Sequence, residues 1–65
     1  MATAGYHGLW CEIVDDSGPK SVEVVVDGEV TFLPKDRIRM PRWWKRGQRV
    51  LVEVEGWLAR ERGFV

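Results

Sequence analysis

The stretch SVEVVVDGEVTFLP, residues 21–34, predicts a β-hairpin. Asp27-Gly28 separates two runs of alternating, largely β-branched residues. Both central residues of a type I′ turn need a positive φ, which Asp and Gly adopt more readily than other residues. Pro34 has no N–H to donate to a strand ladder, so it ends the second run. We therefore expect strands over residues 21–26 and 29–33, joined by a two-residue turn.

The same alternation continues on both sides of this hairpin. Residues 9–14 and 49–55 alternate with a period of two, which predicts two more strands. Ile38 and Met40 fit a further short strand that Pro41 ends. The expected fold is mainly β: a small five-stranded SH3-like or open β-barrel with a short C-terminal helix. A flat meander capped by the helix is the alternative, and the small size favours the barrel because it leaves less apolar face exposed.

The last residues change period. The run from Trp57 to Arg62 has good helix formers and no β-branched residue. Gly63 stands where a helix ends in the left-handed conformation, and Phe64 is placed to fold back on Ala59, as in a Schellman cap. So short a helix persists only if it packs on the sheet. The expected core residues are Trp57, Leu58, Phe64, Val24, Val26, Phe32, Val50 and Val52.

We expect residues 1–8 to form a flexible N-terminal arm and residues 9–65 a single small β-barrel domain. Cys11 is the only cysteine, which excludes a disulfide within the chain and suits a reducing cytoplasm. Residues 1–8 lack the basic and apolar regions of a signal peptide. No apolar run approaches the roughly 20 residues needed to span a bilayer. The expected location is cytoplasmic, with no membrane partner.

Catalytic chemistry finds little support in the sequence. His7 is the sole histidine and lies in the expected arm. Cys11 alternates with apolar neighbours, which predicts a buried, unreactive thiol. One histidine and one cysteine cannot supply the four ligands of a structural zinc site, and no glycine motif for cradling phosphates is present. We therefore expect a protein that is not an enzyme, with no catalytic residues, no metal and no cofactor.

The formal net charge is zero, yet the charges are unevenly distributed along the sequence. Residues 35–49 hold seven basic residues and one acidic residue, a net +6, and the rest of the chain is −6. Arginine and lysine neutralise phosphates, and an exposed tryptophan stacks on an unpaired base. Two tryptophans lie within this basic segment. The predicted nucleic-acid-binding residues are Arg37, Arg39, Arg42, Trp43, Trp44, Lys45, Arg46 and Arg49.

The two adjacent tryptophans are expected to differ in their surroundings. Neighbouring residues in an extended chain point in opposite directions, so we do not expect both to be buried. Core packing is favoured for Trp44, which leaves Trp43 as the stacking residue. The alternative is that one or both close the core, while the basic residues only keep the loop soluble.

Two stretches resemble small, mostly uncharacterised proteins of phages and prophages. In that family a strand ends in Leu-Pro-Lys-Ser followed by isoleucine, which is similar to EVTFLPKDRI at residues 29–38. Its closing strand leads into Trp-Leu-Ala, three polar residues and Gly-Leu, which is similar to VEVEGWLARERGF at residues 52–64. Asp36 and Gly56 depart from the pattern, and residues 41–46 have no counterpart. The resemblance implies a small β domain of phage origin, an accessory protein, and says little about activity.

Other partners also fit the sequence. Phage domains of this size commonly block a host enzyme or defence complex, so the resemblance implies a protein–protein inhibitor or adaptor as the alternative. Tryptophan and arginine are enriched at protein hot spots as well. A third interpretation is an edge-strand homodimer that acts as an assembly module. We favour nucleic acid, either DNA or RNA, over a host protein.

Overall fold

A computed structural model describes residues 5–65 of the chain. Its five strands form one open antiparallel sheet in the order β3-β2-β1-β5-β4, and a short helix follows the last strand. The mainly β prediction with five strands and a C-terminal helix is confirmed. The elements are β1 (Tyr6–Asp15), β2 (Ser21–Val26), β3 (Glu29–Pro34), the 3-10 helix η1 (Lys35–Arg37), β4 (Ile38–Arg39), β5 (Arg49–Glu55) and α1 (Gly56–Glu61).

The predicted hairpin is present and sets the register of β2 and β3. Asp27 and Gly28 have φ values of 51° and 82°, and the turn leaves Val26 opposite Glu29. In the register that this turn sets, the fully buried Val22 and Leu33 are paired on the inner face. The same register places Phe32 on the outer face, where its side chain is 54% exposed. The prediction of Phe32 as a core residue is therefore wrong, because Leu33 takes the inward position.

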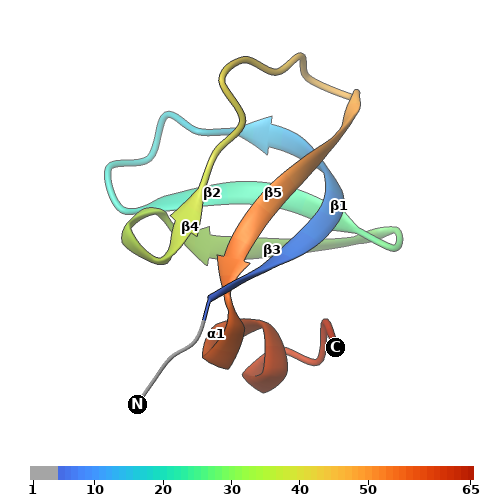
Figure 1. Cartoon of the computed structure of the whole chain (residues 1–65). Coiled ribbons are helices and arrows are strands. Elements are labelled where there is room, and N and C mark those ends of the chain that lie inside the picture. The colour runs from blue at the N-terminus through green and yellow to red at the C-terminus, as the bar shows by residue number, and fades with distance from the viewer. Residues whose placement is uncertain (1–4) are drawn as a thin grey trace.

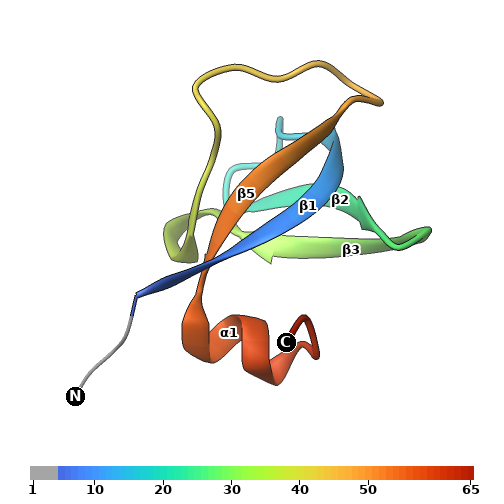
Figure 2. The same ribbon diagram turned by 45° about the vertical axis from the view of Figure 1, so that its right-hand side comes forward.

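The sheet is strongly bent around β1. In Figures 1 and 2, β1 curves along its length, and β5 crosses in front of β2 and β3. The ladder between β1 and β2 is irregular between Ile13 and Asp15, where a bulge increases the local bend. Bending encloses the inner face, so a chain of this size can bury a core between the two halves of one sheet.

The structure extends β1 further toward the N-terminus than the sequence predicts. The strand begins at Tyr6, and Tyr6–Gly8 pair with Glu53–Glu55 of β5. Gly5 also accepts a backbone hydrogen bond from the N–H of Gly56 at 3.1 Å. The last part of the expected flexible arm is therefore sheet. Residues 1–4 of that arm lie outside the described residues.

The C-terminal helix ends in the predicted Schellman cap. The Phe64 N–H donates to the Ala59 carbonyl at 2.8 Å, the Gly63 N–H donates to the Arg60 carbonyl at 3.2 Å, and Gly63 has a φ of 80°. This cap holds Phe64 against the core. Trp57, by contrast, is 50% exposed and donates its indole N–H to Glu55. Its prediction as a core residue is wrong, since the helix presents the next residues to the sheet instead.

The core lies on the inner face of the bent sheet. Three of the remaining predicted core residues, Val24, Val52 and Leu58, are buried. The other three, Val26, Val50 and Phe64, are partly buried against them. The buried residues are Leu9, Cys11, Ile13, Val22, Val24, Leu33, Ile38, Val52, Val54, Leu58 and Ala59.

The two ends of the core are closed by different elements. In Figure 1, α1 lies below the sheet and the segment between β4 and β5 arches over its opposite end. We call this segment, residues 40–48, the β4–β5 loop. No helix within residues 5–65 has the length and apolar character needed to cross a membrane.

Candidate nucleic-acid interface

The β4–β5 loop carries most of the predicted binding residues. Pro41 ends the short strand β4, and the chain then runs without regular structure until β5 begins at Arg49. The loop finishes in a tight turn, in which the Gln48 N–H donates to the Lys45 carbonyl at 3.0 Å. Gly47 adopts a φ of 81° in this turn, a conformation that favours glycine.

The two adjacent tryptophans have different surroundings, as the sequence predicts. Trp44 is half-buried and packs against the core, whereas Trp43 is 68% exposed. Trp44 therefore anchors the loop to the domain, and its side chain is less open to solvent than that of Trp43. Its neighbour is the most exposed large apolar side chain among the described residues, which makes it available for stacking.

Arg37 and Arg39 are already engaged within the domain. Arg37 Nη1 lies 3.9 Å from Glu55 Oε2, and Arg39 Nη1 lies 4.0 Å from Glu53 Oε1. The guanidinium of Arg39 also lies over the ring of Tyr6, 4.1 Å from its centroid. Each of these arginines therefore has a neighbouring carboxylate that competes with a phosphate for its guanidinium, although both pairs are screened by solvent. Both arginines remain at the surface, but they are not free cations.

Lys35 also has a structural role. Its ammonium donates to the Asp16 carbonyl at 2.6 Å, and its backbone N–H donates to the Lys20 carbonyl at 2.8 Å. These bonds tie the end of β3 to the connection between β1 and β2. Lys35 is therefore part of the scaffold of the sheet.

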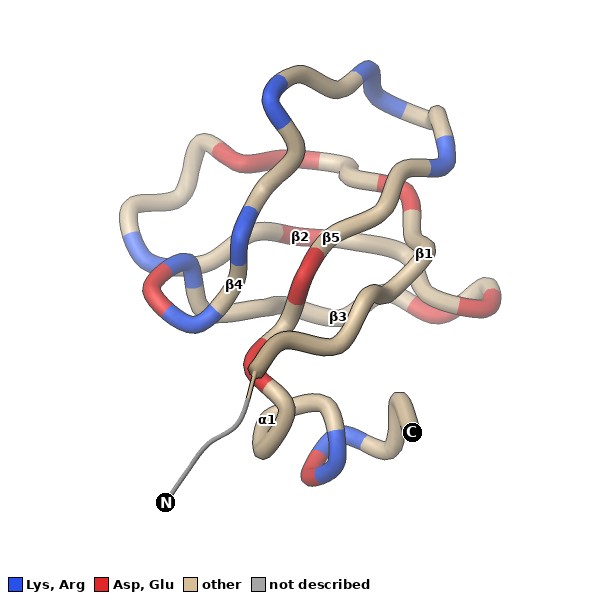
Figure 3. Tube along the Cα trace, viewed as in Figure 1, with Lys and Arg blue, Asp and Glu red and all other residues tan. Residues whose placement is uncertain are grey.

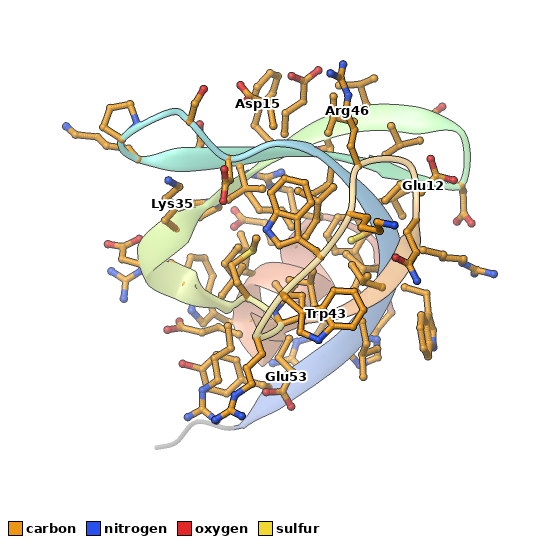
Figure 4. The ribbon with its side chains drawn as sticks, turned by 90° about the horizontal axis from the view of Figure 1, so that it is seen from above. Glu12, Asp15, Lys35, Trp43, Arg46 and Glu53 are labelled. Carbon is orange, nitrogen blue, oxygen red and sulfur yellow. The ribbon has the colours of Figure 1, made fainter. Side chains whose placement is uncertain are left out.

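Three loop cations remain solvent-exposed: Arg42, Lys45 and Arg46. Among residues 5–65, none of the three has a carboxylate oxygen within 4.0 Å. Figure 4 shows Arg46 on the side of Asp15 and Trp43 on the opposite side, toward Glu53. Arg46 and the exposed indole of Trp43 thus lie on different sides of the loop.

Arg46 has an electrostatic influence on its acidic neighbour. The pKa of Asp15 is lowered mainly because its carboxylate accepts hydrogen bonds from the Ser17 hydroxyl at 3.0 Å and the Ser17 N–H at 3.2 Å. The charges of Arg46 and Lys35 lower it further. Arg46 therefore lies close enough to Asp15 for attraction without forming an ion pair.

Arg49 lies near Trp10, a tryptophan that the predicted site did not include. It begins β5 directly after the loop, and its guanidinium carbon lies 6.0 Å from the centroid of the Trp10 ring. Trp10 is 55% exposed on the outer face of β1, opposite Leu51. The alternation of Trp10 with the inward Leu9 and Cys11 was the signal that could have identified it.

Positive charge is interspersed with negative charge over the molecule. Figure 3 shows several basic positions along the β4–β5 loop, with acidic positions on the neighbouring strands and turns. Within residues 5–65 no group of three His, Cys, Asp or Glu side chains is placed to hold a metal ion. The chain matches no protein-family model, no curated protein and no solved structure.

Proposed function

We propose that this protein is a non-catalytic cytoplasmic binding domain that binds nucleic acid through the β4–β5 loop. The observation that supports the proposal is the set of side chains on that loop. The loop carries an indole that is 68% exposed and three exposed cations, none of which forms an ion pair with another residue of the range 5–65. We interpret the bent sheet as an SH3-like open barrel that serves as the rigid support for this loop.

Each part of the loop has a role in the proposed interaction. Arg42, Lys45 and Arg46 attract phosphates and release their counterions, which makes binding dependent on salt. Trp43 stacks on a base, an interaction of about 1–3 kcal/mol. Arg49 continues the basic surface onto β5. Arg37 and Arg39 contribute less, because their attraction for phosphate competes with Glu55 and Glu53.

Titration with fluorescently labelled oligonucleotides tests the proposal. Single-stranded and double-stranded DNA and RNA are titrated with the protein at low and moderate salt. We expect binding at micromolar protein that weakens as salt increases. Trp43→Ala should weaken binding while the far-UV circular dichroism spectrum stays unchanged. Absence of salt-dependent binding at tens of micromolar would overturn the proposal.

A protein partner is the second candidate, and it is supported by a different surface. Val30 and Phe32 on the outer face of β3 are 58% and 54% exposed. Exposed aromatic and aliphatic groups of this kind are common at protein interfaces. For a protein of phage origin, the partner would be a host enzyme or defence complex. Affinity capture from host lysate, with and without nuclease, separates direct protein partners from those bridged by nucleic acid.

A further inference from the structure

An open hollow lies on the sheet beside Arg49, the residue that follows the β4–β5 loop. Its volume is about 350 Å³, within the range of roughly 300–1,000 Å³ that small-molecule sites occupy. It is bounded by the middle of β1, the start of β5 and the turn between β2 and β3, elements that meet on the right of Figure 1. The side chains that give it chemical character are Trp10, Glu12, Asp27 and Arg49.

Strand register brings these side chains together. Trp10 and Glu12 are two residues apart on β1, so both point outward from the sheet. Glu12 is opposite Arg49 on β5 and opposite Val25 on β2. The type I′ turn then adds Asp27, while Gly28 contributes no side chain that would fill the space. The hollow therefore has an aromatic wall, one cation and two carboxylates.

We propose that this hollow takes one unpaired nucleobase, stacked on Trp10, with its phosphate held by Arg49. The proposal rests on the proposed function and makes its ligand single-stranded nucleic acid. An indole on the surface stacks only on a base that has left its duplex, because paired bases are already stacked on their neighbours. Arg49 also begins β5 directly after the loop, so the C-terminal end of the loop adjoins the hollow.

The two carboxylates determine which base fits best. Ionised Glu12 and Asp27 accept hydrogen bonds and cannot donate them. Guanine presents two adjacent N–H donors on its Watson–Crick edge, which match a carboxylate. Thymine and uracil present one N–H between two carbonyl oxygens, which a carboxylate repels. The hollow therefore prefers guanine, with its phosphate turned toward Arg49 and away from the acidic side.

The test uses three 15-nucleotide single strands: oligothymidine, the same strand with one central guanine, and the same strand with inosine at that position. Inosine lacks the exocyclic amino group but keeps the rest of the base. We expect the guanine strand to bind the wild-type protein at least about fivefold more tightly than oligothymidine, and inosine to lose part of this gain. Equal binding of all three strands would contradict the role of the carboxylates. This comparison leaves the protein unchanged, so it does not depend on how any variant folds.

Three tryptophan variants locate the stacked base. Trp10→Ala should weaken binding of the guanine strand by at least about fivefold, whereas Trp10→Phe should keep most of the affinity. Trp57→Ala is the matched control, because Trp57 is similarly exposed at 50% but lies on α1, at the opposite end of the domain from the loop. We expect it to bind as the wild type does.

The outcomes separate this inference from the proposed function. If an Arg42→Ala/Arg46→Ala variant loses affinity while Trp10→Ala and Trp57→Ala both bind as the wild type does, the loop binds nucleic acid and the hollow does not. Equal affinity for the guanine strand and for its duplex would contradict the proposal that the hollow binds an unpaired base. If the wild-type protein binds no strand, both the hollow and the proposed function are wrong.

Discussion

The guanidinium carbon of Arg39 lies 4.1 Å from the centroid of the Tyr6 ring, so this side chain reaches across β5. Arg39 is on β4 and Tyr6 is on β1, the two strands that flank β5 in the sheet. On its way Arg39 also approaches Glu53 of β5, at 4.0 Å. Because β4 is only two residues long, this side chain fastens a weak edge strand to the rest of the sheet.

Removing this contact should reduce stability. We expect Arg39→Ala to lower the free energy of unfolding by about 0.5–1 kcal/mol, the usual contribution of an exposed cation–π contact, with Arg39→Lys losing less. Urea denaturation followed by tryptophan fluorescence measures the change. Arg42→Ala is the control, since Arg42 is exposed on the loop and has no comparable contact with the part of the chain that the structure describes. Equal destabilisation by both substitutions would contradict the structural role of Arg39.

The end of α1 depends on one backbone conformation. Gly63 has a φ of 80°, which costs a residue with a Cβ about 1–2 kcal/mol. Gly63→Ala should lower the thermal midpoint, because the helix keeps Leu58 and Phe64 on the core only while the cap is formed. Gly5→Ala is a suitable comparison, as no atom of residues 7–65 lies within 4 Å of the added Cβ and Gly5 is not among the glycines with positive φ. A thermal midpoint unaffected by Gly63→Ala would show that the cap contributes nothing.

Cys11 should be chemically inert in the folded protein. Its side chain is 2% exposed, and burial raises the pKa of its thiol. We expect a thiol reagent such as Ellman's reagent to react slowly with the native protein and rapidly after denaturation. A rapid reaction with the native protein would show that the inner face of β1 is open to solvent.

The same burial predicts a loss of stability at alkaline pH. A raised folded-state pKa means that the folded protein holds the thiol proton more tightly than the unfolded chain does. The resulting stabilisation is complete below the unfolded-state pKa, and it is lost as pH rises through the folded-state value. Cys11→Ala should remove this part of the pH dependence. An unchanged alkaline decline in the variant would assign it to other groups.

Asp15 provides a probe of the connection between β1 and β2. Ser17→Ala should raise the pKa of Asp15 toward its usual value, because the hydroxyl bond is the main cause of the lowered pKa. Arg46→Ala should raise it less. NMR titration of the Asp15 carboxyl carbon measures both. A larger effect of Arg46→Ala would mean that the charge of the loop, and not the hydrogen bond, controls this group.

The lowered pKa of Asp15 also predicts how the stability of the protein changes in acid. Its folded-state pKa lies below the unfolded value, so the stabilisation is present above the unfolded-state pKa and is lost as pH falls through the folded-state pKa. Ser17→Ala should therefore flatten the acid limb of the stability curve slightly. A steeper acid limb in this variant would contradict the assigned hydrogen bonds.

Local chemistry explains why much of this fold could be predicted from sequence. The Asp27-Gly28 turn and the Gly63 cap each require a backbone conformation that few residues adopt, so they mark the ends of elements directly. Strand alternation shows that two faces differ, but it does not show which face is inside when both contain apolar residues. Phe32 was misplaced for this reason, and the register from the turn resolved it.

The candidate site was less accessible from sequence, because its electrostatics depend on strand pairing. The sequence treats Arg37 and Arg39 as part of one basic segment with Arg42 and Arg46. Pairing of β4 and β5 brings the first two beside Glu53 and Glu55, which are distant in the chain. Trp10 was missed in a similar way, since its proximity to Arg49 follows from the pairing of β1 with β5.

The difference between arginines beside carboxylates and arginines on the open loop can be tested by comparing their effects on binding. Two double variants, Arg42→Ala/Arg46→Ala and Arg37→Ala/Arg39→Ala, each remove two positive charges, so they reduce the general attraction for a polyanion equally. Binding of a labelled single strand is measured at several salt concentrations, at a temperature where both variants are fully folded. We predict that the loop variant loses about tenfold or more in affinity and that its slope of log K against log salt becomes less steep by about 1.4, the loss of two phosphate contacts. The other variant should change much less. Equal losses in the two variants, or no binding by the wild-type protein, would contradict the assignment of the β4–β5 loop as the nucleic-acid interface.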